Sequence, residues 1–154
     1  MNLCSSNPPV CINFIKTNTD AKMRRGSEYS AGYDVLNCEK NILIAPHSRE
    51  LVNVGIRLEE RINENQYIRI APRSSLSLKG LDVCAGVIDS DYIGDIKVLL
   101  CNNSKEGIVV EKGEWIAQLI PEMISIKPVC LNDKVIYGHR IRNDDGFGSS
   151  DQTY

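Results

Sequence analysis

The sequence predicts an all-β protein, a sandwich or barrel of short strands with one short helix. Short apolar runs recur along the 154-residue chain. In each run, apolar residues either alternate with polar ones or follow one another without interruption, which is typical of β-strands. Gly, Pro, Asn and Asp stand between these runs and mark turns. No long segment keeps a helical apolar period. Many short strands at regular spacing are typical of sandwiches and barrels.

The expected strands follow one another from the N-terminus. They are residues 10–15, 41–44, 67–70, 107–110 and 115–120, all rich in Ile, Val or Leu. Turns are expected between them at residues 45–47, 64–65, 102–104 and 112–113. The one helical candidate, residues 74–79, ends at Gly80, because glycine commonly follows the last residue of a helix.

Residues 85–95 (AGVIDSDYIGD) are the most informative stretch of the chain. We expect Val87 and Ile88 to form a strand, residues 89–92 a tight turn and residues 96–101 the returning strand of a hairpin. Such a hairpin offers backbone N–H and C=O groups to a flat heterocycle, and it holds a carboxylate and a phenol ring at fixed positions. Taken alone, the stretch is equally compatible with an acidic, solvated turn.

Length and composition limit the possibilities further. A chain of this size forms one domain, and we expect that domain to comprise residues 1–137, with residues 1–9 frayed and residues 138–154 a flexible tail. The net charge of −2, with both signs scattered, predicts neither nucleic-acid nor membrane binding. The N-terminus does not resemble a secretion signal, so we expect a cytoplasmic or nuclear protein.

The six cysteines show neither a CxxC pair nor a zinc-ligand spacing. We therefore expect reduced thiols. Cys84 and Cys101 lie in strand-like runs, which predicts that they are small, buried core residues.

Several polar residues occur where a phosphate or metal site is plausible. Residues 72–75 (PRSS) suit the start of a helix, where N–H groups attract phosphate, and Arg73 adds a fork of donors. The alternative for this segment is a capped turn with a structural ion pair. For Asp34 the alternative is a side chain that closes a turn, and for Gln118 it is a satisfied core amide. The glycine-rich tail lacks the lysine of a Walker A motif and is compatible with simple disorder.

Five segments, taken in order, resemble the five motifs of the homotrimeric dUTPases. They are residues 30–35 (SAGYDV), 71–76 (APRSSL), 85–95, 112–120 (KGEWIAQLI) and 142–150 (RNDDGFGSS). The resemblance spans nearly the whole chain. It implies a jelly-roll-like β-barrel assembled as a homotrimer. It also implies hydrolysis of dUTP to dUMP and pyrophosphate, which limits uracil incorporation into DNA and supplies dUMP for dTMP synthesis.

The resemblance assigns roles to individual residues. Asp89 is the expected general base, and Tyr92 lies under the deoxyribose, where its ring leaves no space for a 2′-hydroxyl. Asp34 belongs to the network around a Mg²⁺ ion, which it contacts through water. The remaining expected substrate-binding residues are Arg73, Ser74, Ser75, Ala85, Gly86, Val87, Gln118, Arg142, Phe147, Gly148 and Ser149. Of these, Ala85, Gly86 and Val87 read uracil through their backbone.

The chain also departs from the family pattern. Asn143, Asp144 and Asp145 replace a more glycine-rich stretch, and Trp115 and Ile93 stand where arginine is frequent. Two extra carboxylates near a triphosphate weaken closure of the tail.

Two other functions compete with dUTP hydrolysis. One is a dCTP deaminase, which shares the fold but carries a catalytic glutamate where this chain has Leu99. The other is a dUTPase-like trimer that serves mainly as a binding or signalling module with weak catalysis. Turnover of dUTP and of dCTP separates the three functions.

Overall fold

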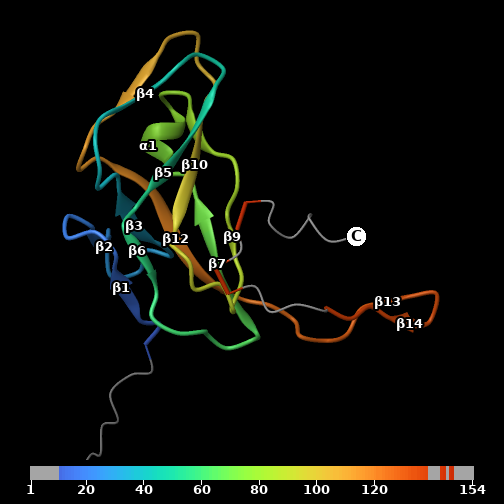
Figure 1. Cartoon of the computed structure of the whole chain (residues 1–154). Helices are drawn as coiled ribbons and strands as arrows, with labels where there is room; N and C mark the ends of the chain where they lie inside the picture. Colours follow the sequence, from blue (N-terminus) through green and yellow to red (C-terminus); the bar gives the residue numbers. More distant parts are fainter. Residues whose placement is uncertain (1–10, 139–142, 145, 148–154) are drawn as a thin grey trace, which may run out of the picture.

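The computed structural model describes residues 11–138, 143, 144, 146 and 147, and it is built almost entirely of short strands (Figure 1). The described elements are β1 (Phe14–Lys16), β2 (Met23–Arg25), β3 (Tyr33–Leu36), β4 (Ile42–Ile44), β5 (Arg49–Asn53), β6 (Ile56–Leu58), β7 (Gln66–Ala71), α1 (Ser74–Ser77), β8 (Leu81–Val83), β9 (Val87–Ile88), β10 (Lys97–Asn102), β11 (Ile108–Val110), β12 (Trp115–Met123), β13 (Cys130–Leu131) and β14 (Lys134–Val135). The predicted all-β class with one short helix is confirmed. Among the described helices, none has the length and apolar character of a membrane span.

The strands form two principal antiparallel sheets. The larger has the order β2-β3-β12-β7-β9 and the smaller the order β5-β10-β8, with additional pairs β1-β6 and β11-β4. Strand β12 lies at the centre of the larger sheet, between β3 and β7. This position matters for function, because β12 brings residues from three distant parts of the sequence to one sheet.

The core fills the space between the sheets with aliphatic side chains. Along β10, Val98 and Leu100 are buried while Leu99 and Cys101 are only partly covered, which is the period-two pattern of a strand with one buried face. Among the described residues two polar ones, Asn37 and Asn102, are fully buried, and both are satisfied: Asn102 Nδ2 donates to the carbonyls of Ile44 and Glu106. Asn37 Nδ2 donates to the carbonyl of Lys40 at 2.8 Å.

One predicted pairing is wrong. Residues 87–88 and 96–101 do form strands, but they do not pair as a hairpin. Strand β9 pairs with β7, where Ile88 lies opposite Ile68, whereas β10 pairs with β5 and β8. Residues 84–95, which we call the crossover segment, therefore carry the chain between the two sheets. The expected strand at residues 10–15 is also shorter in the described part, where β1 begins only at Phe14.

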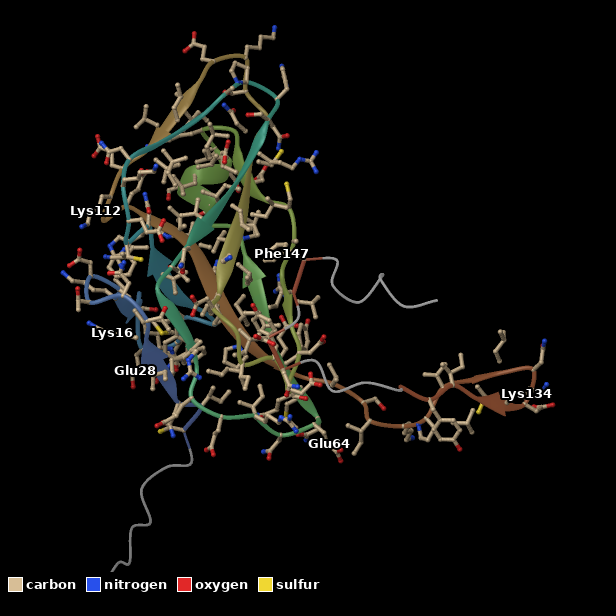
Figure 2. The ribbon with its side chains drawn as sticks, viewed as in Figure 1. Lys16, Glu28, Glu64, Lys112, Lys134 and Phe147 are labelled. Atoms are coloured by element: carbon tan, nitrogen blue, oxygen red, sulfur yellow. The ribbon has the colours of Figure 1, made fainter. Side chains whose placement is uncertain are left out.

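Beyond β12, residues 124–137 leave the sheets as an arm that ends in the β13-β14 hairpin (Figures 1 and 2). Ile126, Val129, Ile136 and Tyr137 are exposed along it. A two-stranded hairpin with apolar side chains in water is only marginally stable by itself. The arm is therefore the most evident surface of this chain that lacks a covering partner within the described residues.

Candidate active site

The crossover segment begins with a close approach between two backbones. The Ile70 N–H donates to the carbonyl of Gly86 at 2.8 Å. A side chain on Gly86 would collide with the carbonyl oxygen of Ile70, so only glycine fits at this position. The backbone around Gly86 is consequently held flat against β7, next to a cavity.

That cavity has a volume of about 360 Å³, and predominantly apolar groups line it. Its lining consists of Ile70, Ala85, Gly86, Val87, Ile88, Tyr92, Asp95, Ile96, Lys97, Gly146 and Phe147. The structure thus brings together five of the residues expected to contact a base or sugar, from two separate motifs. A mostly apolar cavity of this size that exposes backbone groups suits a flat heterocycle with its sugar.

Tyr92 is fixed in orientation at one side of the cavity. Its hydroxyl donates to the carbonyl of Asp95 at 2.9 Å, and its backbone N–H donates to the carbonyl of Asp89 at 3.1 Å. The ring lies so close to Gly94 that a side chain there would collide with it. A ring held at both ends provides a rigid wall rather than a movable gate.

The described part of the tail contacts the crossover segment of the same chain. The Ile93 N–H donates to the carbonyl of Asn143 at 2.6 Å, and Arg61 Nη2 donates to Asn143 Oδ1 at 2.8 Å. Phe147 lines the cavity, and Figure 2 labels it beside the body of the molecule. Arg142, Gly148 and Ser149, which are also expected substrate ligands, lie outside the described residues.

Asp89 directly follows β9, and its side chain is half-buried. It is one residue past Ile88, which lines the cavity, but it does not itself belong to the lining. The N–H of Ile62 donates to the carbonyl of the adjacent Ser90 at 3.0 Å, which anchors this turn to the preceding loop.

A second group of expected site residues gathers around the middle of β12. Gln118 lies opposite Asp34 of β3 on one side and opposite Ala71 of β7 on the other. Its Nε2 donates to the carbonyl of Pro72 at 3.0 Å. Gly32 packs directly over the Gln118 side chain, which would have to shift to make room for a larger residue at position 32. Sheet pairing thus joins the first, second and fourth motifs.

The carboxylate of Asp34 is held by two arginines. Oδ1 lies 3.3 Å from Nε of Arg73 and Oδ2 lies 3.2 Å from Nε of Arg24, while only 14% of the side chain is exposed. Arg73 Nη1 also donates to the carbonyl of Trp115 at 2.8 Å, and the guanidinium of Arg24 lies 4.3 Å from the centre of the Trp115 ring. Trp115 therefore accepts the cation–π contact that holds Arg24 in place.

Ser74 and Ser75 open helix α1, and both are exposed. Arg73 occupies the N-cap position, and no side chain caps the helix. Since α1 spans only four residues, its dipole is weak and any phosphate contact depends on the serine hydroxyls and on Arg73.

Strand β7 links the two groups of residues. Ile70 lines the cavity, Ala71 pairs with Gln118, and the chain then continues through Pro72 to Arg73. Asp34, Arg73, Ser74, Ser75 and Gln118 do not line the cavity of their own chain.

A magnesium ion fits this arrangement only through water or through the substrate. Among the described residues, no three His, Cys, Asp or Glu side chains cluster as metal ligands. Each Asp34 oxygen already faces one arginine N–H, which leaves acceptor capacity for a water molecule on the metal. Mg²⁺ typically keeps several waters and takes its remaining ligands from phosphates.

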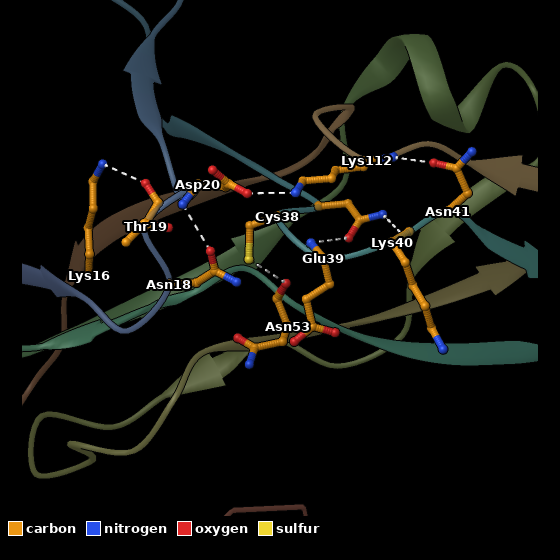
Figure 3. A network of polar contacts seen from close by, with 11 residues as sticks. Lys16, Asn18, Thr19, Asp20, Cys38, Glu39, Lys40, Asn41, Asn53 and Lys112 are labelled. Carbon is orange, nitrogen blue, oxygen red and sulfur yellow. Dashed lines mark hydrogen bonds and ion pairs between the residues drawn. The ribbon is translucent and has the colours of Figure 1, made fainter.

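A second hollow, of about 520 Å³, lies beside residues 20–22, 36–38 and 112–115. Figure 3 shows contacts made by three of the side chains that line it: Lys112 Nζ lies 2.6 Å from Asp20, and the Cys38 thiol donates to the carbonyl of Asn53 at 3.5 Å. These contacts are structural, because they join protein groups to one another.

The sequence-based reasoning missed Arg24, Arg61 and Asp95. Arg24 contacts the expected site residue Asp34 through its side chain, and Asp95 contacts Tyr92 through its carbonyl. Arg61 contacts Asn143 of the last motif, which is 82 positions away in sequence. Trp115 was noted only as a departure, whereas its ring and its carbonyl both support the arginines.

Known proteins are similar to this chain over most of its length. The family model described as dUTPase matches residues 20–151. The deoxyuridine 5'-triphosphate nucleotidohydrolase of Paramecium bursaria Chlorella virus 1 is 42% identical over 127 residues, which cover 82% of this chain and 86% of that protein. The enzyme of the same name from Variola virus is 40% identical over 146 residues, covering 90% and 92%. Among solved structures, a D95N mutant dUTPase of the S. aureus phage phi11, which holds a structural Mg(II) ion, superposes with a TM-score of 0.72. Its sequence is 18% identical, and the match covers 81% of this chain and 98% of that chain.

Proposed function

The chain belongs to the dUTPase family, and on this premise we propose that it hydrolyses dUTP to dUMP and pyrophosphate. The observation that carries the proposal is the cavity of about 360 Å³ formed by the backbone of residues 85–87, the fixed ring of Tyr92 and Phe147. The location we propose is the cytoplasm or nucleus, where deoxynucleotide pools are found.

The base is selected by backbone groups and by shape. Uracil pairs with the N–H and C=O groups of residues 85–87, which Gly86 holds against β7. Cytosine presents a donor where uracil presents an acceptor, so it leaves a backbone N–H unpaired at a cost of about 1–3 kcal/mol. The thymine methyl group meets the same closely held backbone. Tyr92 excludes a 2′-hydroxyl because its ring cannot move away.

The chemical step requires an activated water. Asp89 accepts a proton from a water that attacks phosphorus, the bond to the bridging oxygen breaks, and pyrophosphate leaves with that oxygen. Arg73, Ser74 and Gln118 orient the triphosphate by hydrogen bonding, as do Ser75, Arg142, Gly148 and Ser149, and Asp34 holds Arg73 in position. When bound, Mg²⁺ would neutralise the phosphate charges, and Asp34 is the residue that would hold it, through water.

The active assembly that we propose is a homotrimer with composite sites. In one chain the cavity and the polar residues around Gln118 do not share a lining, and the apolar side chains of residues 124–137 are exposed within the described part of the chain. Both facts are explained if neighbouring copies supply the missing wall and the missing cover.

Release of pyrophosphate from dUTP, measured with and without Mg²⁺ on protein of known mass, tests the function. We expect Mg²⁺-stimulated turnover of dUTP, and much slower turnover of dTTP, dCTP and UTP. Ammonia release from dCTP would instead indicate a deaminase, although Leu99 offers no group to transfer a proton. Binding of dUTP without turnover would indicate the signalling module.

Subunit complementation tests the composite site. We expect Asp89→Asn and Gln118→Ala proteins, each nearly inactive, to regain part of the turnover when the two chains are co-expressed, because some mixed sites then contain both wild-type residues. Light scattering should give the mass of three chains. An active monomer, or mixed protein without regained turnover, contradicts the composite site.

A further inference from the structure

Cys84 and Cys101 lie on the same outer face of the β5-β10-β8 sheet. In the register of β8 and β10, Cys101 is opposite Asp82 and Leu100 is opposite Val83. The pairing continues one residue further, where the Cys84 N–H donates to the carbonyl of Leu99 at 2.8 Å. The two cysteines are thus diagonal neighbours on one sheet face, and that face is away from the core because Val98 and Leu100 point the other way.

Cys84 is exposed and Cys101 is half-buried, so the expectation that both are core residues is wrong for Cys84. The reason is that Cys84 follows the end of β8 on the sheet face that points away from the core. Although Cys84 is exposed, partial desolvation of its sulfur raises the pKa of its thiol, and a hydrogen bond with the Cys101 thiol raises that pKa further. The sheet register places the two thiols as diagonal neighbours on the same face. Among the described cysteines, none is in a disulfide.

We propose that Cys84 and Cys101 form a reversible intrachain disulfide, and that this disulfide weakens nucleotide binding by displacing the crossover segment. The first half of the proposal is independent of the function, whereas the second half rests on the proposed dUTP site.

The oxidant that the reaction requires is a hydroperoxide. One cysteine thiolate attacks the peroxide oxygen, the O–O bond breaks, and a sulfenic acid forms as an alcohol or water leaves with a proton. The second thiolate attacks that sulfur, the S–S bond forms, the S–O bond breaks, and the hydroxide leaves as water after taking the second proton. Two electrons pass from the two sulfurs to the peroxide.

Closing the bond must move the backbone. Diagonal neighbours in a sheet have Cβ atoms farther apart than the roughly 3.5–4.5 Å that a disulfide needs. Strand β10 is central in its sheet and is paired on both sides, whereas Cys84 has already left β8. The movement therefore falls on Cys84 and on the following Ala85 and Gly86, which line the cavity.

Disulfide mapping tests the first half. The trimeric protein is treated with a small excess of hydrogen peroxide, free thiols are blocked, and proteolytic peptides are analysed by mass spectrometry. We expect a peptide pair that joins Cys84 to Cys101 and separates on addition of dithiothreitol. Only sulfenic or higher oxides at these positions, or bonds to other cysteines, would overturn the proposal.

Kinetics on the same samples tests the second half. We expect the KM for dUTP to rise by at least about fivefold on oxidation, the lower end of typical coupling between sites, and to return with dithiothreitol. Cys84→Ser and Cys101→Ser should each abolish the change, whereas Cys130→Ser, at an exposed position on β13, should preserve it. If the disulfide is mapped but the KM for dUTP does not change, the proposed effect of the disulfide on nucleotide binding is overturned. If the reduced protein shows no dUTP turnover at all, that result counts against the proposed function instead.

Discussion

Nε of Arg73 lies 3.3 Å from Oδ1 of Asp34, so the segment that precedes α1 is tied to β3 across the intervening strand β12. The same guanidinium donates to the carbonyl of Trp115 on β12 at 2.8 Å. One side chain thus connects three parts of the sequence that hold expected phosphate or metal ligands. Its planar fork is what makes the two directed contacts possible.

Arg73→Lys should therefore be harmful although the charge is kept. A lysine ammonium cannot reproduce both contacts of the fork, and we expect the free energy of unfolding to fall by about 1–3 kcal/mol, the usual cost of losing a hydrogen bond to a charged group. Turnover should fall as well, because Asp34 and the phosphate-binding turn lose their common support. Urea denaturation and pyrophosphate release measure the two effects. Arg49→Lys, at an exposed position, is the control. Wild-type stability of Arg73→Lys would show that the ion pair is not structural.

Glu122 predicts a pH-dependent contribution to stability. It lies opposite Tyr67 across β7 and β12, accepts a hydrogen bond from the Tyr67 hydroxyl, and pairs with Arg69 at 2.7 Å. Hydrogen bonds from Tyr67 and then Arg69 lower the pKa of Glu122 below its ordinary value of 4.5. A lowered folded-state pKa gives stability that is present above the ordinary value and is lost as the pH falls through the folded-state pKa.

Glu122→Gln should accordingly lower the Tm at neutral pH, and the difference from wild type should shrink as the pH falls below 4.5. Thermal denaturation followed by circular dichroism over that range provides the measurement. Glu64→Gln, an exposed position without such partners, should show no pH-dependent difference. A constant difference at all pH values would mean that the effect of Gln is steric rather than electrostatic.

Local patterns were sufficient to predict several elements. Strands β4, β7, β11 and β12 lie at or within a few residues of the predicted runs, because each run is apolar and bounded by Gly, Pro or Asn. Strands β5 and β6 were not predicted, since RELVN shows no period of two and IRL, although it alternates, is only three residues long. Their pairing depends on β10 and β1, which are distant in sequence.

The residues of the candidate site were likewise predicted from local motifs, whereas the contacts between them were not. Sequence motifs indicated Gly86, Tyr92 and Gln118, but not how they meet. The pairing of β9 with β7 rather than β10 depends on the close contact of Gly86 with Ile70, which no local pattern encodes. Likewise, the two arginines around Asp34 become visible only when β2, β3 and β12 lie side by side.

Asp89→Asn tests the general base. Asparagine has nearly the same shape but cannot accept a proton from water, so kcat should fall by at least about 10²-fold while nucleotide binding is retained. Asp91→Asn, two residues further in the same turn, is the matched control and should retain most of the turnover. Isothermal titration with a non-hydrolysable dUTP analogue measures binding. Near-normal kcat in Asp89→Asn contradicts the assignment.

Tyr92 should control discrimination between deoxyribose and ribose. In Tyr92→Ala the wall is gone, and we expect the preference for dUTP over UTP, expressed as a ratio of kcat/KM values, to fall by at least about tenfold. Tyr92→Phe keeps the ring but loses the hydrogen bond to the Asp95 carbonyl, so it should keep most of the preference. Equal ratios in wild type and Tyr92→Ala would show that another group excludes the 2′-hydroxyl.

The tail carries the last prediction. Phe147 lines the cavity, and Asn143 is hydrogen-bonded to Ile93 and Arg61. The tail therefore reaches the proposed nucleotide-binding cavity of its own chain. A chain that ends at residue 141 should remain folded and trimeric but lose most of its turnover. Asp144 and Asp145 repel a triphosphate, so replacing them by Ser and Gly should lower the KM by a few-fold, most strongly at low salt, because exposed charges interact weakly and are screened. Asp133→Ser, in the turn between β13 and β14, removes a carboxylate elsewhere and should leave the KM unchanged. Full turnover of the truncated chain would show that the last motif takes no part in the reaction.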